Sequence, residues 1–236
     1  MQRYFAKIKN NIVTLGDDDV HHLLHVMRAR INDEIEVVDN GKLFSCSIDS
    51  INPLVIKANY EIPLDSELPT NLTLFFALAK GDKIEFVIQK ATELGATRIV
   101  LIKTERCVVK FDDKDFKKKL IRYQRIAKEA SEQSHRLKIP EIQGLYDLKK
   151  IPEELLEEVN LLAYEKAAGK TDSLFNKISH NKSTSVMIGP EGGFSEAEVE
   201  HLIKHGFDVI SLGKRILRTE TAAVYALSVI GFLMER

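Results

Sequence analysis

Apolar and polar residues alternate in short runs over the first 65 residues, and turn-forming residues separate the runs, as in β-strands. Asn10 and Asn11 end the first run, and residues 39–41 form a hairpin-type turn after the second. One amphipathic helix is expected between these two runs, with an acidic start at residues 17–19. Strands are expected at residues 3–8, 34–38, 43–48 and 54–62, and together they predict a small β-barrel.

A proline-containing linker, residues 62–71, precedes a different pattern. Apolar strand-like runs now alternate with amphipathic helices, which indicates a parallel sheet covered on both faces. The sequence therefore predicts an α/β protein of two domains, a β-barrel at 1–68 and an α/β domain at 72–236. In the second domain, strands are expected at residues 72–77, 98–103, 160–164, 185–189 and 208–212, and helices at residues 82–94, 116–133, 196–205 and 221–234.

Composition and charge limit the classes of function that the chain can have. Hydrophobic residues make up 44% and charged residues 29% of the chain, an ordinary globular balance without an apolar run long enough to span a membrane. The two cysteines, Cys46 and Cys107, are too few for a disulfide framework, so we expect a cytoplasmic protein. A net charge of −1 argues against a general nucleic-acid binder. Residues 103–138 nevertheless hold 12 Lys/Arg against 6 Asp/Glu, which is either a solvated helix face or a phosphate-facing surface.

Two segments that follow predicted strands carry the candidate chemistry. The first, residues 189–193, is rich in glycine, and its main chain can approach a ligand closely; Ser195 and Glu198 then form a capping box for the next helix. The second, residues 212–221, opens the last helix and places Arg218 and Glu220 at its entrance. Either segment alone is also compatible with an ordinary turn or cap. Ligands of parallel α/β sheets bind beyond the carboxyl ends of the strands, which is where both segments are expected.

Together these segments resemble the cofactor loops of the RsmE family, the small-subunit rRNA uracil-N3 methyltransferases of the SPOUT superfamily. Three further stretches match the family in order, at residues 21–28, 80–95 and 129–136, with Met27 where the family usually has leucine. The resemblance covers the whole chain. It implies a PUA-like β-barrel followed by a SPOUT α/β domain with a deep trefoil knot, whereas periodicity alone predicts an unknotted sheet. It also implies S-adenosyl-L-methionine as cofactor, a homodimer with composite active sites, and 16S rRNA in the small ribosomal subunit as substrate.

The resemblance and the loop positions together give a set of candidate residues. Arg136 is the leading candidate to touch the uracil or its phosphate, because a guanidinium forks onto oxygens. Glu220 or a phosphate oxygen would accept the N3 proton. RNA contacts are expected from Arg3, Arg28, Arg30, Lys80 and Arg125. Cofactor contacts are expected from Ile188, Gly189, Pro190, Glu191, Gly192, Leu212, Gly213, Ile216, Leu217, Arg218 and Thr221.

Other chemistries find little support. Residues 167–171 end like a phosphate-binding P-loop, but Tyr164 stands where its first glycine is required. His21 and His25 have metal-ligand spacing without the glutamate of a His-Glu-x-x-His motif, so no metal is expected. The alternatives that stay open are another SPOUT methyltransferase, acting on a ribose 2′-hydroxyl or a different base, and a non-enzymatic ribosome-assembly factor. The assembly factor would need the basic stretch but not both cofactor loops.

Overall fold

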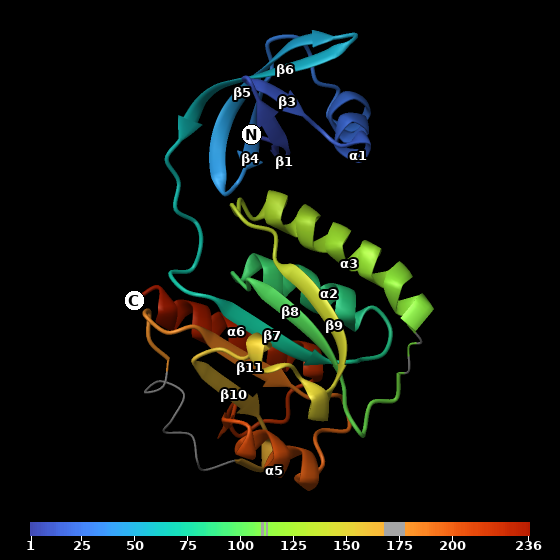
Figure 1. The fold of residues 1–236 in the computed structure, drawn as a ribbon, viewed down its shortest axis with the longest axis vertical. Helices are drawn as coiled ribbons and strands as arrows, with labels where there is room; N and C mark the ends of the chain where they lie inside the picture. Colours follow the sequence, from blue (N-terminus) through green and yellow to red (C-terminus); the bar gives the residue numbers. More distant parts are fainter. Residues whose placement is uncertain (110, 112, 168–177) are drawn as a thin grey trace. The chain divides into compact units, whose positions relative to one another are not determined.

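The fold is described from a computed structural model that covers residues 1–109, 111, 113–167 and 178–236 (Figure 1). The chain forms two compact units. The first contains Met1–Glu67 and also Ser131–Lys138, a segment that the predicted boundary at residue 68 does not include. The second contains Leu68–Ala130 and Ile139–Arg236.

The first unit is a six-stranded sheet with the order β1-β4-β5-β6-β3-β2. Its pairs are antiparallel except for the parallel pair β1 and β4. The inward side chains Tyr4, Leu23, Val37 and Ile48 are almost fully buried and form its core. The strands are β1 (Arg3–Phe5), β2 (Lys7–Lys9), β3 (Ile12–Thr14), β4 (Glu34–Asp39), β5 (Lys42–Ile51) and β6 (Leu54–Ile62).

Two predictions for this unit need correction. The single strand expected at 3–8 is two strands, because β1 pairs with β4 whereas β2 forms a hairpin with β3. The expected helix is α1 (Asp17–His21) followed by a π-helical turn at His22–Val26, and Gly16 rather than an aspartate is its N-cap residue. The predicted turns are confirmed: Asn10, Asn11, Asn40 and Gly41 all have positive φ, as tight hairpin turns of the type I′ class require.

The second unit contains the predicted parallel sheet, with six strands in the order β12-β10-β11-β7-β8-β9. Sequence periodicity missed one edge strand, β9. Its glycine, Gly144, has φ +104°, and a Cβ there would lie 2.5 Å from the carbonyl oxygen of Leu101. The register of β8 and β9 shifts at this point, which interrupts the alternation that predicts a strand. The strands are β7 (Leu72–Ala77), β8 (Arg98–Lys103), β9 (Glu141–Asp147), β10 (Val159–Ala163), β11 (Thr184–Ile188) and β12 (Phe207–Ile210).

Helices cover both faces of this sheet (Figure 1). Helices α2 (Lys83–Glu93), α3 (Asp113–Gln133) and α6 (Thr219–Met234) contribute to one core, and α5 (Glu196–Lys204) packs on the opposite face. Short 3-10 turns lie at Leu148–Lys150, Glu153–Leu155 and Glu165–Ala167. Within the described part of the chain, every helix is too short or too polar to cross a membrane.

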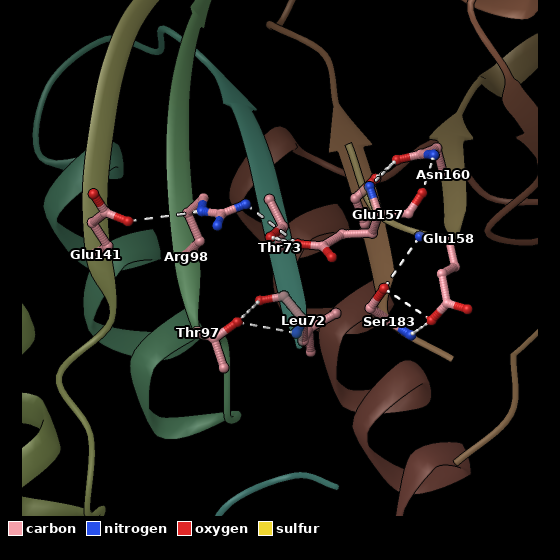
Figure 2. Close-up of polar contacts among 10 residues, drawn as sticks. Leu72, Thr73, Thr97, Arg98, Glu141, Glu157, Glu158, Asn160 and Ser183 are labelled. Carbon is pink, nitrogen blue, oxygen red and sulfur yellow. Dashed lines mark hydrogen bonds and ion pairs between the residues drawn. The ribbon is translucent and has the colours of Figure 1, made fainter. Parts of the chain in front are cut away.

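A polar network closes the amino edge of the sheet, where the parallel strands begin (Figure 2). The Glu157 carboxylate, 8% exposed, accepts a hydrogen bond of 2.6 Å from Thr73 Oγ1 and lies 3.4 Å from Arg98 Nη1. Asn160 Nδ2 donates to the Glu157 carbonyl at 2.6 Å, and Ser185 Oγ donates to Asn160 Oδ1 at 2.6 Å. Glu157 and Asn160 therefore link the beginnings of four strands.

Candidate active site

A cavity of about 540 Å³ opens at the other edge of the sheet, where the strands end. Its walls come from the segments that follow β10, β11 and β12, which are neighbours in the order β12-β10-β11. The volume falls within the range of small-molecule sites, roughly 300–1,000 Å³. The three contributing segments are Ala163–Glu165, Ile188–Phe194 and Ser211–Thr219, to which Lys83 and Ala222 add.

The loop after β11 is held in place from several sides. Thr219 Oγ1 donates a 2.6 Å hydrogen bond to the Gly189 carbonyl, and Arg106 Nη1 donates to the Gly192 carbonyl at 3.0 Å. The predicted capping box is confirmed: Ser195 N donates to Glu198 Oε2 at 2.8 Å, and Glu198 N donates to Ser195 Oγ at 3.3 Å. The loop is therefore ordered by contacts within the protein, which lowers the entropy cost of binding a ligand.

Two glycines of the cavity are required for different reasons. A Cβ at Gly189 would lie 2.9 Å from the ring of Phe194, which is 2% exposed and cannot retreat into solvent. Gly213 instead has φ +110°, and no heavy atom lies within 4 Å of a Cβ built there. Gly189 is thus required by packing, and Gly213 by its backbone conformation.

The loop after β12 leads directly into α6. This helix begins at Thr219, two residues before the predicted start, and the Thr219 hydroxyl donates to the Gly189 carbonyl instead of capping the helix. Arg218 is the N-cap residue but makes no side-chain cap. Ile216 is 84% exposed, while Leu217 is partly buried against the core. The loop therefore presents a mixture of apolar side chains and cations to the cavity.

Lys83 joins two carboxylates at the rim of the cavity. Its ammonium lies 2.8 Å from Glu191 Oε1 and 3.3 Å from Glu220 Oε2. The hydrogen bond to Glu191 raises the pKa of Lys83, burial opposes this, and Glu220 adds to the rise. Burial acts to raise the pKa of Glu191, but hydrogen bonds, above all that from Lys83, outweigh it and the net pKa is lowered. Lys83 and Glu191 thus hold one another in their charged forms.

Ten of the eleven residues expected to contact a cofactor line the cavity. The exception is Thr221, which is exposed on α6, and Thr219 lies at the cavity in its place. Lys83, Tyr164 and Glu165 also line it and were not expected. The lysine lies in a stretch that matched the family, but Tyr164 and Glu165 follow a strand end without any glycine-rich signal.

The two catalytic candidates lie in different units. Glu220 is on the first turn of α6 beside the cavity, with a side chain 19% exposed. Arg136 belongs to the first unit, where its side chain is 3% exposed and its Nη2 lies 2.6 Å from Glu67 Oε2. Glu67 Oε1 also accepts hydrogen bonds from the main-chain amides of Leu137 and Lys138. As placed, Arg136 presents its guanidinium to a carboxylate rather than to solvent.

The candidate RNA contacts also differ in exposure. Arg28, Arg30, Lys80 and Arg125 are exposed. Arg3 is 3% exposed and pairs with Glu36 at 2.7 Å, so its charge is already matched inside the first unit. The P-loop-like residues 168–171 lie outside the described part of the chain.

Comparison with known proteins identifies the class to which this fold belongs. A family model described as an RNA methyltransferase domain matches residues 66–231, and one described as an RNA methyltransferase PUA domain matches residues 15–57. The fold is therefore that of an RNA methyltransferase with an N-terminal PUA-like domain and a C-terminal α/β domain built on a parallel sheet.

Full-length relatives make the family more specific. The ribosomal RNA small subunit methyltransferase E of Bacillus subtilis is 36% identical and covers 100% of this chain and 98% of its own length. The structure of the Neisseria gonorrhoeae enzyme of that name, bound to S-adenosyl methionine, matches with a TM-score of 0.85 and 32% identity over 99% of this chain and 98% of its own. A SAM-bound methyltransferase structure from Legionella pneumophila matches with a TM-score of 0.87 and 30% identity over 97% and 96%. The chain belongs to the ribosomal RNA small subunit methyltransferase E family.

Proposed function

We propose that this protein transfers a methyl group from S-adenosyl-L-methionine to N3 of a uridine in 16S rRNA. The observation that carries the proposal is the cavity at the ends of β10, β11 and β12, which gathers both glycine-containing loops. Family membership supports the substrate class.

The residues of the cavity fit this cofactor. Gly189, Gly192 and Gly213 line the cavity without side chains, so the main chain can approach an adenosine and an amino-acid moiety closely. Ile188, Leu212 and Leu217 offer apolar surface for a purine ring. Glu165 also lines the cavity and gives it a negative charge that suits a positively charged ligand. When bound, S-adenosyl-L-methionine supplies an electrophilic methyl group on a positively charged sulfur.

The protein has to position the uracil and remove a proton. N3 of neutral uracil carries a proton, and its lone pair becomes available only when that proton leaves. We assign proton acceptance to Glu220, because its carboxylate lies 3.3 Å from the ammonium of Lys83, which lines the cavity; a phosphate oxygen of the RNA is the alternative. A positioned base contributes roughly 10²–10⁴-fold, and orientation contributes up to about 7–11 kcal/mol. Glu220→Gln should lower single-turnover methylation at least tenfold while the cofactor still binds, whereas an unchanged rate would favour the phosphate.

Two basic groups are proposed to act on RNA differently. Lys117 and Lys118 are exposed on α3, and Lys119 lies 5.1 Å from the ring of Phe111, so this run suits general phosphate attraction. Replacing all three by alanine should flatten the salt dependence of RNA binding, by up to about 0.9 log unit per lost phosphate contact on a duplex.

Arg136 is proposed to contact the uracil or its phosphate, which requires its guanidinium to exchange Glu67 for the RNA. Arg136→Ala should then slow methylation with cofactor affinity retained, and unfolding measurements separate this from a loss of stability.

We further propose a trefoil knot and a homodimer, both on the basis of family membership. The dimer also has physical support in the second unit. Helix α6 is mainly apolar, and two of its aromatic side chains, Tyr225 and Phe232, are 43% and 56% exposed. Light scattering at micromolar concentration should give twice the 26.8 kDa of the chain, and an active monomer would contradict this part of the proposal. An experimental structure traced through residues 184–236 tests the knot.

The decisive experiment has two arms. Isothermal titration calorimetry with S-adenosyl-L-methionine should show saturable binding, which an assembly factor without a cofactor would not. Nuclease digestion and mass spectrometry of 16S rRNA from cells with and without the protein should then reveal one N3-methyluridine that depends on it. A missing 2′-O-methyl group or a different methylated base would replace the proposed target.

A further inference from the structure

The lysine that bridges two carboxylates lies outside both loops that the sequence predicts to bind the cofactor. Lys83 is the first residue of α2, which follows β7 through the turn at Gly81, a residue with φ +65°. Glu191 lies in the loop after β11, and Glu220 lies in the first turn of α6. Because β7 and β11 are adjacent parallel strands, their carboxyl ends bring the lysine and Glu191 together.

Charge makes this arrangement more than a surface pair. Two carboxylates converge on one ammonium, so each would face a like charge if the ammonium were absent. The Lys83, Glu191 and Glu220 side chains are 28%, 37% and 19% exposed, so water screens them only in part. A lone exposed ion pair contributes little, roughly 0–1 kcal/mol, but removing Lys83 would also leave an uncompensated repulsion.

We propose that Lys83 is a positioning residue, which connects the loop after β11 to the first turn of α6. It thereby fixes the spacing between the loop after β11 and the loop after β12, which leads into α6. Thr219 already joins these segments through the Gly189 carbonyl, and Lys83 adds a second connection through Glu191, two residues further along the loop. The connection spans the rim of the cavity, which Lys83 and Glu191 both line. This inference rests on the proposed function only in its choice of S-adenosyl-L-methionine as the binding probe.

The pair is complete over a broad pH range. The pKa of Lys83 is raised above 10.5, so its contribution is present below that pH and is lost only as the pH rises through the folded value. The pKa of Glu191 is lowered below 4.5, so its contribution is present above that pH and is lost as the pH falls through the folded value. Lys83 and Glu191 are therefore both charged at neutral pH, so cofactor affinity measured there reports on the intact ion pair.

The chain offers a closely matched control on the same helix. Lys90 pairs with Glu93 at 2.8 Å, and its side chain is 32% exposed, but it does not line the cavity. Lys83→Met and Lys90→Met each remove one partly exposed ammonium from α2 and keep the aliphatic length. We expect calorimetry to show S-adenosyl-L-methionine binding about fivefold to tenfold weaker in Lys83→Met and unchanged in Lys90→Met. Lys83→Arg should retain most of the affinity, because it keeps the charge.

A triple variant separates positioning from direct contact with the ligand. If Lys83 acts through the two carboxylates, adding Glu191→Gln and Glu220→Gln to Lys83→Met removes the repulsion and restores part of the affinity. If Lys83 instead contacts the ligand directly, the neutralised carboxylates give no recovery, and the positioning role is wrong. Equal affinities of Lys83→Met and Lys90→Met would also overturn it. Failure of the wild-type protein to bind would overturn the proposed function instead, so the two results are distinguishable.

Discussion

The two edges of the parallel sheet are built from the same strands but in opposite ways. At the amino edge, β7, β8, β10 and β11 begin in a network in which Thr73, Arg98, Asn160 and Ser185 are tied together around Glu157 (Figure 2). At the carboxyl edge, β10, β11 and β12 end in loops that surround a cavity. Side chains hydrogen-bond to one another at the first edge, whereas glycine-containing loops and a few charged residues line a cavity at the second.

The two edges therefore use their polar groups differently, for internal hydrogen bonds at the amino edge and around a cavity at the carboxyl edge. A buried carboxylate such as Glu157 is tolerated only when hydrogen bonds and an ion pair compensate its lost hydration. Such a network fixes the starts of the strands. At the carboxyl edge, hydrogen bonds such as that from Thr219 to the Gly189 carbonyl keep the loops ordered, while the cavity between them stays open. Changes at the amino edge should therefore affect stability, and changes at the carboxyl edge should affect binding.

The largest effect is expected at Gly189. A Cβ there would meet the Phe194 ring at 2.9 Å, so Gly189→Val forces the loop or the buried ring to move. Overpacking of this kind costs about 1–3 kcal/mol, and the displaced loop should no longer bind S-adenosyl-L-methionine. Calorimetry measures the affinity, and thermal unfolding verifies that the variant still folds. Undiminished binding would show that this loop is not part of the cofactor site.

The amino edge should respond in the opposite way. Glu157→Gln removes the negative charge of the carboxylate that accepts a hydrogen bond from Thr73 and pairs with Arg98. Hydrogen bonds to charged groups contribute about 1.5–3 kcal/mol. We expect a loss of about 1–3 kcal/mol in unfolding free energy with cofactor affinity unchanged. The neighbouring Glu158, which is exposed, provides the control, and Glu158→Gln should cost less. A Glu157→Gln variant of normal stability but weakened binding would reverse the roles of the two edges.

Sequence patterns predicted the carboxyl edge much better than the amino edge. Glycines and a capping box are local signals, so residues 188–192 and 212–218 could be placed at the ends of strands before any contact was known. The partners of Glu157 lie 84 and 59 residues away along the chain, and no periodicity encodes such pairs. The same reason explains why Lys83 was missed, since Glu191 lies 108 residues from it. Arg136 was found through a family motif, but its pairing with Glu67 depends on Ser131–Lys138 joining the first unit.

A smaller effect is expected from two glycines at the ends of β12. Gly206 precedes the strand and has φ +85°, Gly213 follows it with φ +110°, and neither has a heavy atom within 4 Å of a Cβ built there. Alanine at either position should cost about 1–2 kcal/mol of stability, because L-residues rarely adopt such a φ. Only Gly213→Ala should also weaken S-adenosyl-L-methionine binding, since Gly213 lines the cavity. Parallel loss of affinity in both variants would mean that strain in β12, rather than the ligand loop, controls binding.

The smallest effect comes from a pair of threonines that allows the most direct comparison of the two edges. Thr73 and Thr219 are both buried, at 0% and 6% exposure, and each donates a 2.6 Å hydrogen bond, Thr73 to Glu157 and Thr219 to the Gly189 carbonyl. Valine has nearly the same shape as threonine but no hydroxyl, so each substitution removes one hydrogen bond, about 0.5–1.5 kcal/mol. Both variants should lose that amount in urea unfolding of the ligand-free protein. Calorimetry should then separate them: Thr219→Val is expected to bind S-adenosyl-L-methionine about threefold to tenfold more weakly, because the Gly189 carbonyl is no longer held, whereas Thr73→Val should bind like the wild type. If both variants lose affinity equally, the amino-edge network also controls the ligand loops, and the two edges are coupled through the strands rather than independent.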